Sequence, residues 1–403
     1  MNGTDIERRI NFLRLLLIIG LVFLHYGEFP GSDQSPFRGW SSTDTPVATF
    51  INSFFLFLFF SAVPVLSTIS GYLYFKGMDS GIGFYLRRWR SRVRSVLLPM
   101  ISWNAFVVVL FLAIGALWPS ATLQSIIDYD VTDLDAGSTL NALVGVTRHP
   151  INFQFWFLHD LLLTVLCTPL LGFLIRKAPF IGLLGIGFAW LADYDFVIFF
   201  RSDVLFFFYL GGLARLRYWN LDFLSHRAAL SLMAAYVVLI ALRTLAPAYV
   251  DPQGMAGEFL LGPGTSLLRV VGVLSFWGCA PMLMETFWGR RVTALGAVAF
   301  FLHAIHWPLN QFIKLGLAQL MPGDGEAAML FNYFATIALT LVAALLIARI
   351  MTRVAPGLFS HLSGGRSIDW TAAAALARAS RPPVPAPAET ALRKAEIRHG
   401  SAR

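Results

Sequence analysis

The stretch INFLRLLLIIGLVFLHY, residues 10–26, is apolar enough to enter a lipid bilayer, yet it carries Arg14 and His25. The two residues are eleven positions apart, which is almost three helical turns at about 3.6 residues per turn. Both side chains therefore project from one face of the predicted helix, roughly 16 Å apart along its axis. Ionisable groups in a membrane segment usually face a bundle interior or a wet cavity, because exposing them to lipid is costly. We therefore expect this helix to form one wall of a site.

Each of the two residues also has a simpler interpretation. Arg14 could set the topology and extend its charge to the inner membrane surface. His25 could be an interfacial histidine without a chemical role. The shared helix face favours the functional interpretation, but spacing alone does not decide between the two.

The composition indicates a membrane protein. Of the 403 residues, 57% are hydrophobic and only 13% are charged, whereas soluble domains carry about 25% charged residues. The net charge is +8, but basic residues in membrane proteins mostly set topology, so no nucleic-acid partner is expected. Cys167 and Cys279 both lie in apolar runs, so no disulfide framework is expected. The first apolar segment is expected to be retained, because Arg14 interrupts it and no small-residue cleavage site follows.

Ten apolar segments follow one another along the chain. The sequence therefore predicts an all-α, polytopic integral membrane helical bundle of about ten transmembrane helices. The expected spans cover about residues 10–26, 47–75, 95–117, 153–175, 179–192, 196–214, 228–245, 265–287, 292–317 and 327–350. They belong to one membrane domain, residues 1–352. Residues 353–403 are basic and rich in Ala and Pro, and we expect a disordered cytoplasmic tail that can be removed after about Gly365.

Basic residues are distributed unevenly between the expected loops. The loops after the second, fourth, sixth and eighth spans hold thirteen Lys and Arg residues, whereas only Arg38 and Arg148 lie clearly in the opposite loops. The positive-inside rule therefore predicts cytoplasmic N and C termini. It places Arg14 near the inner surface of the membrane and His25 near the outer surface, beside the polar loop of residues 28–46.

Five short motifs occur in order along the chain. They are Arg14 and His25 with ten residues between them, Ser70-Gly71-Tyr72, the basic residues 87–94 followed by Pro99 and Trp103, Trp-Phe-Leu-x-Asp-Leu at 156–161, and His306 with Pro308. In this combination the chain resembles the membrane acyltransferase family 3 over about residues 8–350. It departs from the family at His159, where Arg is common in related sequences, and at His303, which is an additional histidine.

The resemblance implies an integral-membrane O-acyltransferase of the cell inner (plasma) membrane with several spans. It implies transfer of a small acyl group, often acetyl, from cytoplasmic acyl-CoA to a hydroxyl group of an extracytoplasmic carbohydrate or glycolipid. Acetyl-CoA is the expected donor co-substrate, and no permanently bound cofactor is implied. The implied partners are the donor, the acceptor and membrane lipid.

The two ends of such a reaction need different side chains. Arginine binds phosphate through two parallel hydrogen bonds, so the phosphates of acyl-CoA could be held at the inner end. The predicted donor-binding residues are Arg14, Arg87, Arg88, Arg90 and Arg94. A solvated loop that sets topology is the alternative for residues 87–94. At the outer end, His25 is the predicted general base, because histidine titrates near neutral pH.

Further catalytic candidates lie in the fourth and ninth spans. Asp160 is either a polar cap at a helix start or a catalytic partner of His25 or His306. His306 is also the alternative base. His303 and His306 are three positions apart, but no cysteine or HExxH pattern accompanies them, so no metal site is expected.

Three residues are predicted to bind the acceptor. Glu28 follows His25 by three residues and could orient it if the first helix extends that far. Trp156 is either an interfacial anchor or a platform on which a sugar stacks. His159 completes this set.

Two other functional classes compete with acyl transfer. A transporter or flippase of an anionic or lipid-linked solute should have repeated halves with paired broken helices, and no convincing internal repeat is found in the sequence. A membrane sensor whose tail recruits partners would be expected to carry a recognisable soluble domain, and none is found.

Overall fold

The structure is a computed structural model that describes residues 3–40, 42, 45–79, 81–118, 121–194, 198, 200–371, 373 and 375. The described residues form helices joined by turns and contain no strand, which confirms the all-α prediction. The α-helices are α1 (Gly3–Leu24), α2 (Pro46–Phe59), α3 (Ala62–Tyr74), α4 (Ile82–Arg92), α5 (Leu98–Leu117), α6 (Ala121–Gln124), α7 (Ala136–Val144), α8 (Trp156–Leu166), α9 (Thr168–Lys177), α10 (Pro179–Leu191), α11 (Ser202–Leu216), α12 (His226–Leu245), α13 (Met255–Leu261), α14 (Pro263–Leu283), α15 (Phe287–Ala294), α16 (Ala299–Leu320), α17 (Glu326–Val354) and α18 (Pro356–Leu362).

Several of these helices are long and apolar enough to cross a membrane. Five continuous stretches of the described chain qualify, namely 46–74, 82–117, 226–248, 255–283 and 326–354. Two bent pairs, α8 with α9 at 61° and α15 with α16 at 52°, raise the number to seven if each pair is one span. The multi-pass architecture is therefore supported, but the expected count of ten is not confirmed. The fifth and sixth expected spans are short helices, with 13 residues in α10 and 15 in α11.

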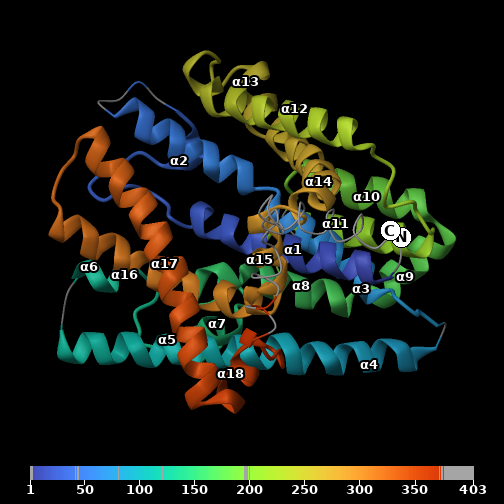
Figure 1. Ribbon diagram of the computed structural model, residues 1–403, viewed down its shortest axis with the longest axis horizontal. Coiled ribbons are helices and arrows are strands. Elements are labelled where there is room, and N and C mark those ends of the chain that lie inside the picture. The colour runs from blue at the N-terminus through green and yellow to red at the C-terminus, as the bar shows by residue number, and fades with distance from the viewer. Residues whose placement is uncertain are drawn as a thin grey trace, which may run out of the picture.

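Helix α1 lies near the middle of the bundle. In Figure 1, α12 and α14 run along one edge and α4 with α5 along the opposite edge, with α1 between them. Helix α1 packs against α2, α3, α15 and α16, and its Leu13 and Leu17 are fully buried. Arg9 forms an ion pair of 2.7 Å with Asp222. Protein groups, rather than lipid, therefore surround most of this charged helix.

The closest helix crossing in the core joins α3 to α11. A Cβ atom placed on Gly71 would lie 2.0 Å from the carbonyl oxygen of Phe208, and one on Gly211 would lie 2.0 Å from that of Thr68. Both positions therefore require glycine, because a side chain would push the backbones apart. Small residues let membrane helices approach in this way, and this is the packing role expected for the Ser70-Gly71-Tyr72 motif.

The basic stretch that was expected to be a loop is helical. Helix α4 continues through one π-helical turn, Val93–Leu97 (η2), into α5. The stretch contains no proline before Pro99 and is rich in arginine, which is a good helix former. The π-helical turn lies directly before Pro99, whose ring and missing N–H disturb the α-helical hydrogen bonds of the preceding turn.

The expected disorder does not begin at residue 353. Helix α18 packs Phe359, which is 2% exposed, against the bundle. The Oγ atom of Ser102 lies 2.8 Å from Nε2 of His361, and the indole of Trp103 donates a hydrogen bond to the carbonyl of Leu362. The prediction is therefore wrong for residues 356–371, where a few apolar side chains anchor a segment of otherwise polar composition. The Ala/Pro-rich residues 376–403 lie outside the described residues.

Candidate functional site

Two histidines from distant parts of the chain meet at the C-terminal end of α1. His25 follows the last residue of α1, and His306 lies in α16. The Nδ1 atom of His25 is 2.8 Å from Nε2 of His306. Their rings are nearly parallel, with an interplanar angle of 13°. His25 is 8% exposed and His306 is fully buried, so water competes little for this hydrogen bond.

A backbone carbonyl decides which nitrogen atoms carry protons in this pair. The Nδ1 atom of His306 lies 3.1 Å from the carbonyl oxygen of Leu302, which can only accept a hydrogen bond. In neutral His306 the proton is therefore on Nδ1, and Nε2 is the acceptor. His25 must then donate through Nδ1–H, which leaves the lone pair of neutral His25 on Nε2. These two hydrogen bonds, from His25 to His306 and from His306 to the carbonyl of Leu302, form a relay. The relay leaves Nε2 of His25 ready to accept a proton.

His25 lines a cavity of about 560 Å³. We call this space the histidine cavity. Its wall includes apolar side chains, the aromatic residues Trp156 and Trp307, and the charged residues Glu28, Arg201, Asp203, Arg269 and Lys314. A volume of this order suits a small ligand or part of a larger one. The cavity therefore offers a reaction space beside His25.

The residues predicted to bind the acceptor do not all have the positions and contacts that were expected of them. Trp156 and Glu28 both line the histidine cavity. Glu28 does not orient His25, because α1 ends at Leu24 and the partner of the His25 side chain is His306. Instead, the backbone carbonyl of Glu28 accepts a hydrogen bond from Nζ of Lys314.

Asp160 and His159 contact Phe200 and Arg201, which line the histidine cavity. Asp160 is fully buried, and its carboxylate accepts hydrogen bonds from the backbone N–H groups of Phe200 and Arg201. It also contacts Nδ1 of His159, whose ring stacks on Phe200 at 4.4 Å between centroids. Two interpretations of Asp160 were left open, and the structure does not show the one that makes it a partner of His25 or His306. The local reason is that these two backbone N–H groups and His159 already surround the carboxylate.

His303, the additional histidine, is buried one turn before His306. Both of its ring nitrogens lack a hydrogen-bond partner, and its ring centroid is 5.6 Å from that of His306. The aromatic rings of Phe155 and Phe157 pack against it. Among the described residues, no group of three or more His, Cys, Asp or Glu side chains is arranged to hold a metal ion.

Near the middle of α1, beside Arg14, arginines from three separate segments come together. The guanidinium group of Arg14 is near those of Arg92 and Arg366, close enough for mutual repulsion. All three side chains are partly buried. None of them forms an ion pair with a carboxylate of the described chain. Burial lowers the pKa of the Arg366 guanidinium. A cluster of unpaired cations is suited to a ligand with several negative charges.

The predicted donor-binding arginines of α4 do not all join this cluster. Arg87 forms an ion pair with Asp79, and Arg88 donates to the carbonyl of Lys76. Arg87, Arg90 and Arg94 line a separate groove of about 530 Å³ together with Gly364 and Gly365. Arg92 and Arg366 were missed in the sequence. The position of Arg92 on the inner helix face could have been found if residues 82–92 had been interpreted as helix.

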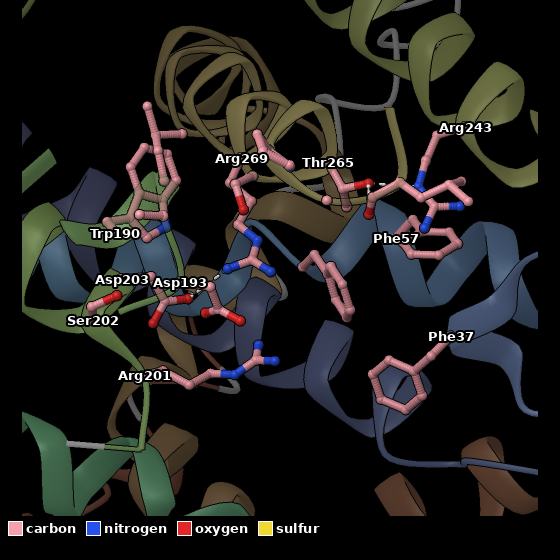
Figure 2. Close-up of a pocket in the computed structure, with 17 residues that line it drawn as sticks. Phe37, Phe57, Trp190, Asp193, Arg201, Ser202, Asp203, Arg243, Thr265 and Arg269 are labelled. Carbon is pink, nitrogen blue, oxygen red and sulfur yellow. Dashed lines mark hydrogen bonds and ion pairs between the residues drawn. The ribbon is translucent and has the colours of Figure 1, made fainter. Parts of the chain in front are cut away.

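A second cavity, of about 430 Å³, adjoins the histidine cavity. The two cavities share the lining residues Phe37, Phe60, Arg201, Asp203 and Arg269. Arg243 and Trp190 complete its polar wall, as Figure 2 shows. No sequence pattern indicated this cavity, because its lining residues come from several distant segments, including α2, α10, α11, α12 and α14.

The chain is similar to known proteins over most of its length. Residues 7–349 match the acyltransferase domain family, acyltransferase 3. The succinoglycan biosynthesis protein ExoH of Rhizobium meliloti (strain 1021) is 26% identical over 370 residues, which cover 90% of this chain and 93% of ExoH. No solved structure is detectably similar to the chain. The chain is thus a multi-pass membrane protein and an O-acyltransferase, and it belongs to the acyltransferase 3 family.

Proposed function

We propose that this enzyme transfers a small acyl group, with acetyl as the first candidate, from cytoplasmic acyl-CoA to a hydroxyl group of an extracytoplasmic carbohydrate or glycolipid. Membership of the acyltransferase 3 family supports acyl transfer. The name of the relative ExoH assigns that protein to the biosynthesis of a glycan, succinoglycan. The single observation that carries the proposal is the hydrogen bond between His25 and His306 beside a cavity of substrate size.

The proposed orientation has both termini in the cytoplasm of a cell with the enzyme in its inner membrane. The support for it is the excess of basic residues in alternate loops of the sequence. In this orientation the arginine cluster of Arg14, Arg92 and Arg366 faces the cytoplasm, where acyl-CoA is made. His25 and the histidine cavity face the outer side, where the acceptor is presented. The count of ten spans remains part of this proposal.

The chemistry follows from the protonation of the histidine pair. The acceptor hydroxyl gives its proton to Nε2 of His25 while its oxygen attacks the carbonyl carbon of the thioester. The carbon–sulfur bond then breaks, an ester forms, and the proton ends on the departing CoA thiol. His306 stabilises the positive charge that develops on His25, because its Nε2 accepts the Nδ1–H hydrogen bond. General-base catalysis of this kind typically contributes about 10²–10⁴-fold.

The arginine cluster is proposed to hold the phosphate groups of the donor. Three cations without carboxylate partners gain most from a ligand with several negative charges. The thioester must then extend outward along α1 toward His25. His303 lies beside this route, one helical turn inward of His306, with both ring nitrogens free of hydrogen bonds.

Glycan analysis tests this function directly. Envelope glycans from cells with the gene, without it, and with the His25→Ala variant should be compared by mass spectrometry. We expect an acyl mass increment that requires the gene and is lost with His25→Ala. Glycans of equal acylation in all three strains would reject the proposal. Purified enzyme in lipid nanodiscs with radiolabelled acetyl-CoA would then identify the acyl group.

A further inference from the structure

The second cavity is walled by hydrogen-bond donors that have no partner. Arg243 is 8% exposed, its Nε donates to the hydroxyl of Thr265, and its guanidinium lies 4.3 Å over the ring of Phe57. Its Nη1 atom nevertheless makes no hydrogen bond. The indole N–H of Trp190 and the Nε atom of Arg269 are likewise buried without a partner. The Oδ1 atom of Asp203, an acceptor in the same wall, is also buried without a partner. Buried polar groups are normally satisfied, so these three donors and one acceptor indicate a polar ligand that accepts more hydrogen bonds than it donates.

The charges around the cavity favour an anion. Arg269 is paired with Asp203 at 2.9 Å, which neutralises both. Arg201 and Arg243 remain, and neither forms an ion pair with a carboxylate of the described chain. Figure 2 shows Arg201 and Arg243 on opposite sides of the space, with Asp193 as the other acidic side chain near it. The wall therefore carries one more positive than negative charge.

The cavity lies between the outer groove and the catalytic histidine. Arg243 and Phe37 also line an open groove of about 1360 Å³, whose wall includes residues 31–34, 37–40, 42 and 45 together with Pro247 and Pro252. Arg201 and Arg269 also line the histidine cavity. A ligand that enters from the groove would therefore meet Arg243 first and His25 last. A volume of about 430 Å³ is at the lower end of the range of small-molecule sites, which suits one or two sugar units.

We propose that this cavity binds an anionic group of the acceptor, a carboxylate or a phosphate, between Arg243 and Arg201, and thereby holds a neighbouring hydroxyl group at His25. The inference rests on the proposed function, because it assumes that the acceptor is a carbohydrate. It adds that the acceptor is anionic and assigns two positioning residues for it. The guanidinium groups of Arg243 and Arg201 would bind the oxygens of this anionic group.

Binding measured without donor tests the site separately from acyl transfer. Saturation-transfer NMR titrations with the enzyme in nanodiscs should compare three probes at constant ionic strength: glucose, glucuronate and glucose 1-phosphate. We expect at least one anionic probe to bind about tenfold tighter than glucose, as for a hydrogen-bonded charge pair. The anionic probe that binds more tightly shows whether the site prefers a carboxylate or a phosphate. Equal binding of all three probes would overturn the proposal.

Substitutions then test which residues cause the preference for an anionic probe over glucose. Arg243→Gln and Arg201→Gln should each remove most of it, and Arg243→Lys should retain part of it because the charge remains. Arg38→Gln is the matched control, because Arg38 is an exposed arginine of the outer groove that does not line the second cavity. Thermal unfolding checks that each variant is folded. If Arg243→Gln does not fold, Arg201→Gln tests the proposal by itself. An anionic preference that survives in both folded Gln variants would also overturn the proposal. Absence of acyl transfer to any acceptor would reject the proposed function but not this binding site.

Discussion

The Nδ1 atom of His25 lies 2.8 Å from Nε2 of His306, across 281 positions of sequence. If the two residues act as one unit, their substitutions should not be additive. His25→Ala should lower turnover by about 10²–10⁴-fold, and His306→Ala should lower it less, because His25 keeps its lone pair. The double variant should be no slower than His25→Ala within about twofold. Single-turnover rates in nanodiscs measure this, and independent, multiplying effects would contradict the relay.

The arginine cluster predicts a role for the segment after the family domain. Arg366→Gln should raise the KM for acyl-CoA about tenfold, the cost of one charge-assisted hydrogen bond, with little change in kcat. Truncation after Gly365 should have the same effect, and truncation after residue 375 should not, which revises the expectation that the tail can be removed after about Gly365. Arg87→Gln is the control, because Arg87 is exposed and paired with Asp79. Normal donor affinity after truncation at Gly365 would remove Arg366 from the site.

The crossing of α3 and α11 predicts a strong effect of a small substitution. Gly211→Ala places a Cβ atom 2.0 Å from the Thr68 carbonyl oxygen, so the helices must separate. Overpacking typically costs about 1–3 kcal/mol, and thermal unfolding in detergent should show a clear decrease in stability. Gly185→Ala in α10 is the control, because a Cβ atom there meets nothing within 4 Å. Equal unfolding temperatures for the two variants would show that the crossing is not tightly packed.

The proposed orientation predicts which surface cysteines react from outside the cell. Asp133→Cys, in an expected outer loop, should react with a membrane-impermeant maleimide in intact cells. Arg90→Cys, on the exposed face of α4, should react only after the membrane is permeabilised. The parent protein, with Cys167 and Cys279, gives the baseline. A tag after Arg403 that reacts from outside would reverse the orientation.

Asp135 predicts a pH dependence of stability outside the membrane segments. It caps α7, and hydrogen bonds from the hydroxyl and the backbone N–H of Ser138 lower its pKa below the ordinary value of 3.8. A lowered folded pKa means that the charged cap stabilises the fold above the ordinary value and that this stabilisation is lost as the pH falls below it. Asparagine is also a good cap but does not titrate. The stability difference between the protein and Asp135→Asn should therefore shrink as the pH falls from 6 to 3, and a difference that stays constant over this range would contradict the prediction.

Much of the fold class could be predicted, because the length of a run of apolar residues directly indicates a membrane helix. The pair Arg14 and His25 could be found from helical spacing within one segment. The partner of His25 was assigned to Glu28 or Asp160 from closeness in sequence or motif, whereas packing of α16 against α1 brings His306 instead. Such pairings between distant segments depend on tertiary packing, which one sequence does not reveal.

The remaining differences have local physical causes. Residues 82–94 were predicted to belong to a loop because they are highly charged, although their helix propensity is high. Residues 356–371 were interpreted by average composition, although Phe359 alone is enough to anchor α18. The second cavity could not be predicted, because Arg243 and Arg269 are single cations in apolar helices whose faces meet only in the folded bundle.

The central position of α1 has a consequence for biosynthesis. This helix precedes the other described helices in the chain, but Asp222 and His306, which pair with Arg9 and His25, are made 213 and 281 positions later. At about 5–20 residues per second, the second interval lasts on the order of 15–60 s. During that time the basic groups of α1 have no partners from the chain itself. Assembly must therefore keep the first helix at the insertion machinery, or at the membrane surface, until α16 has been synthesised.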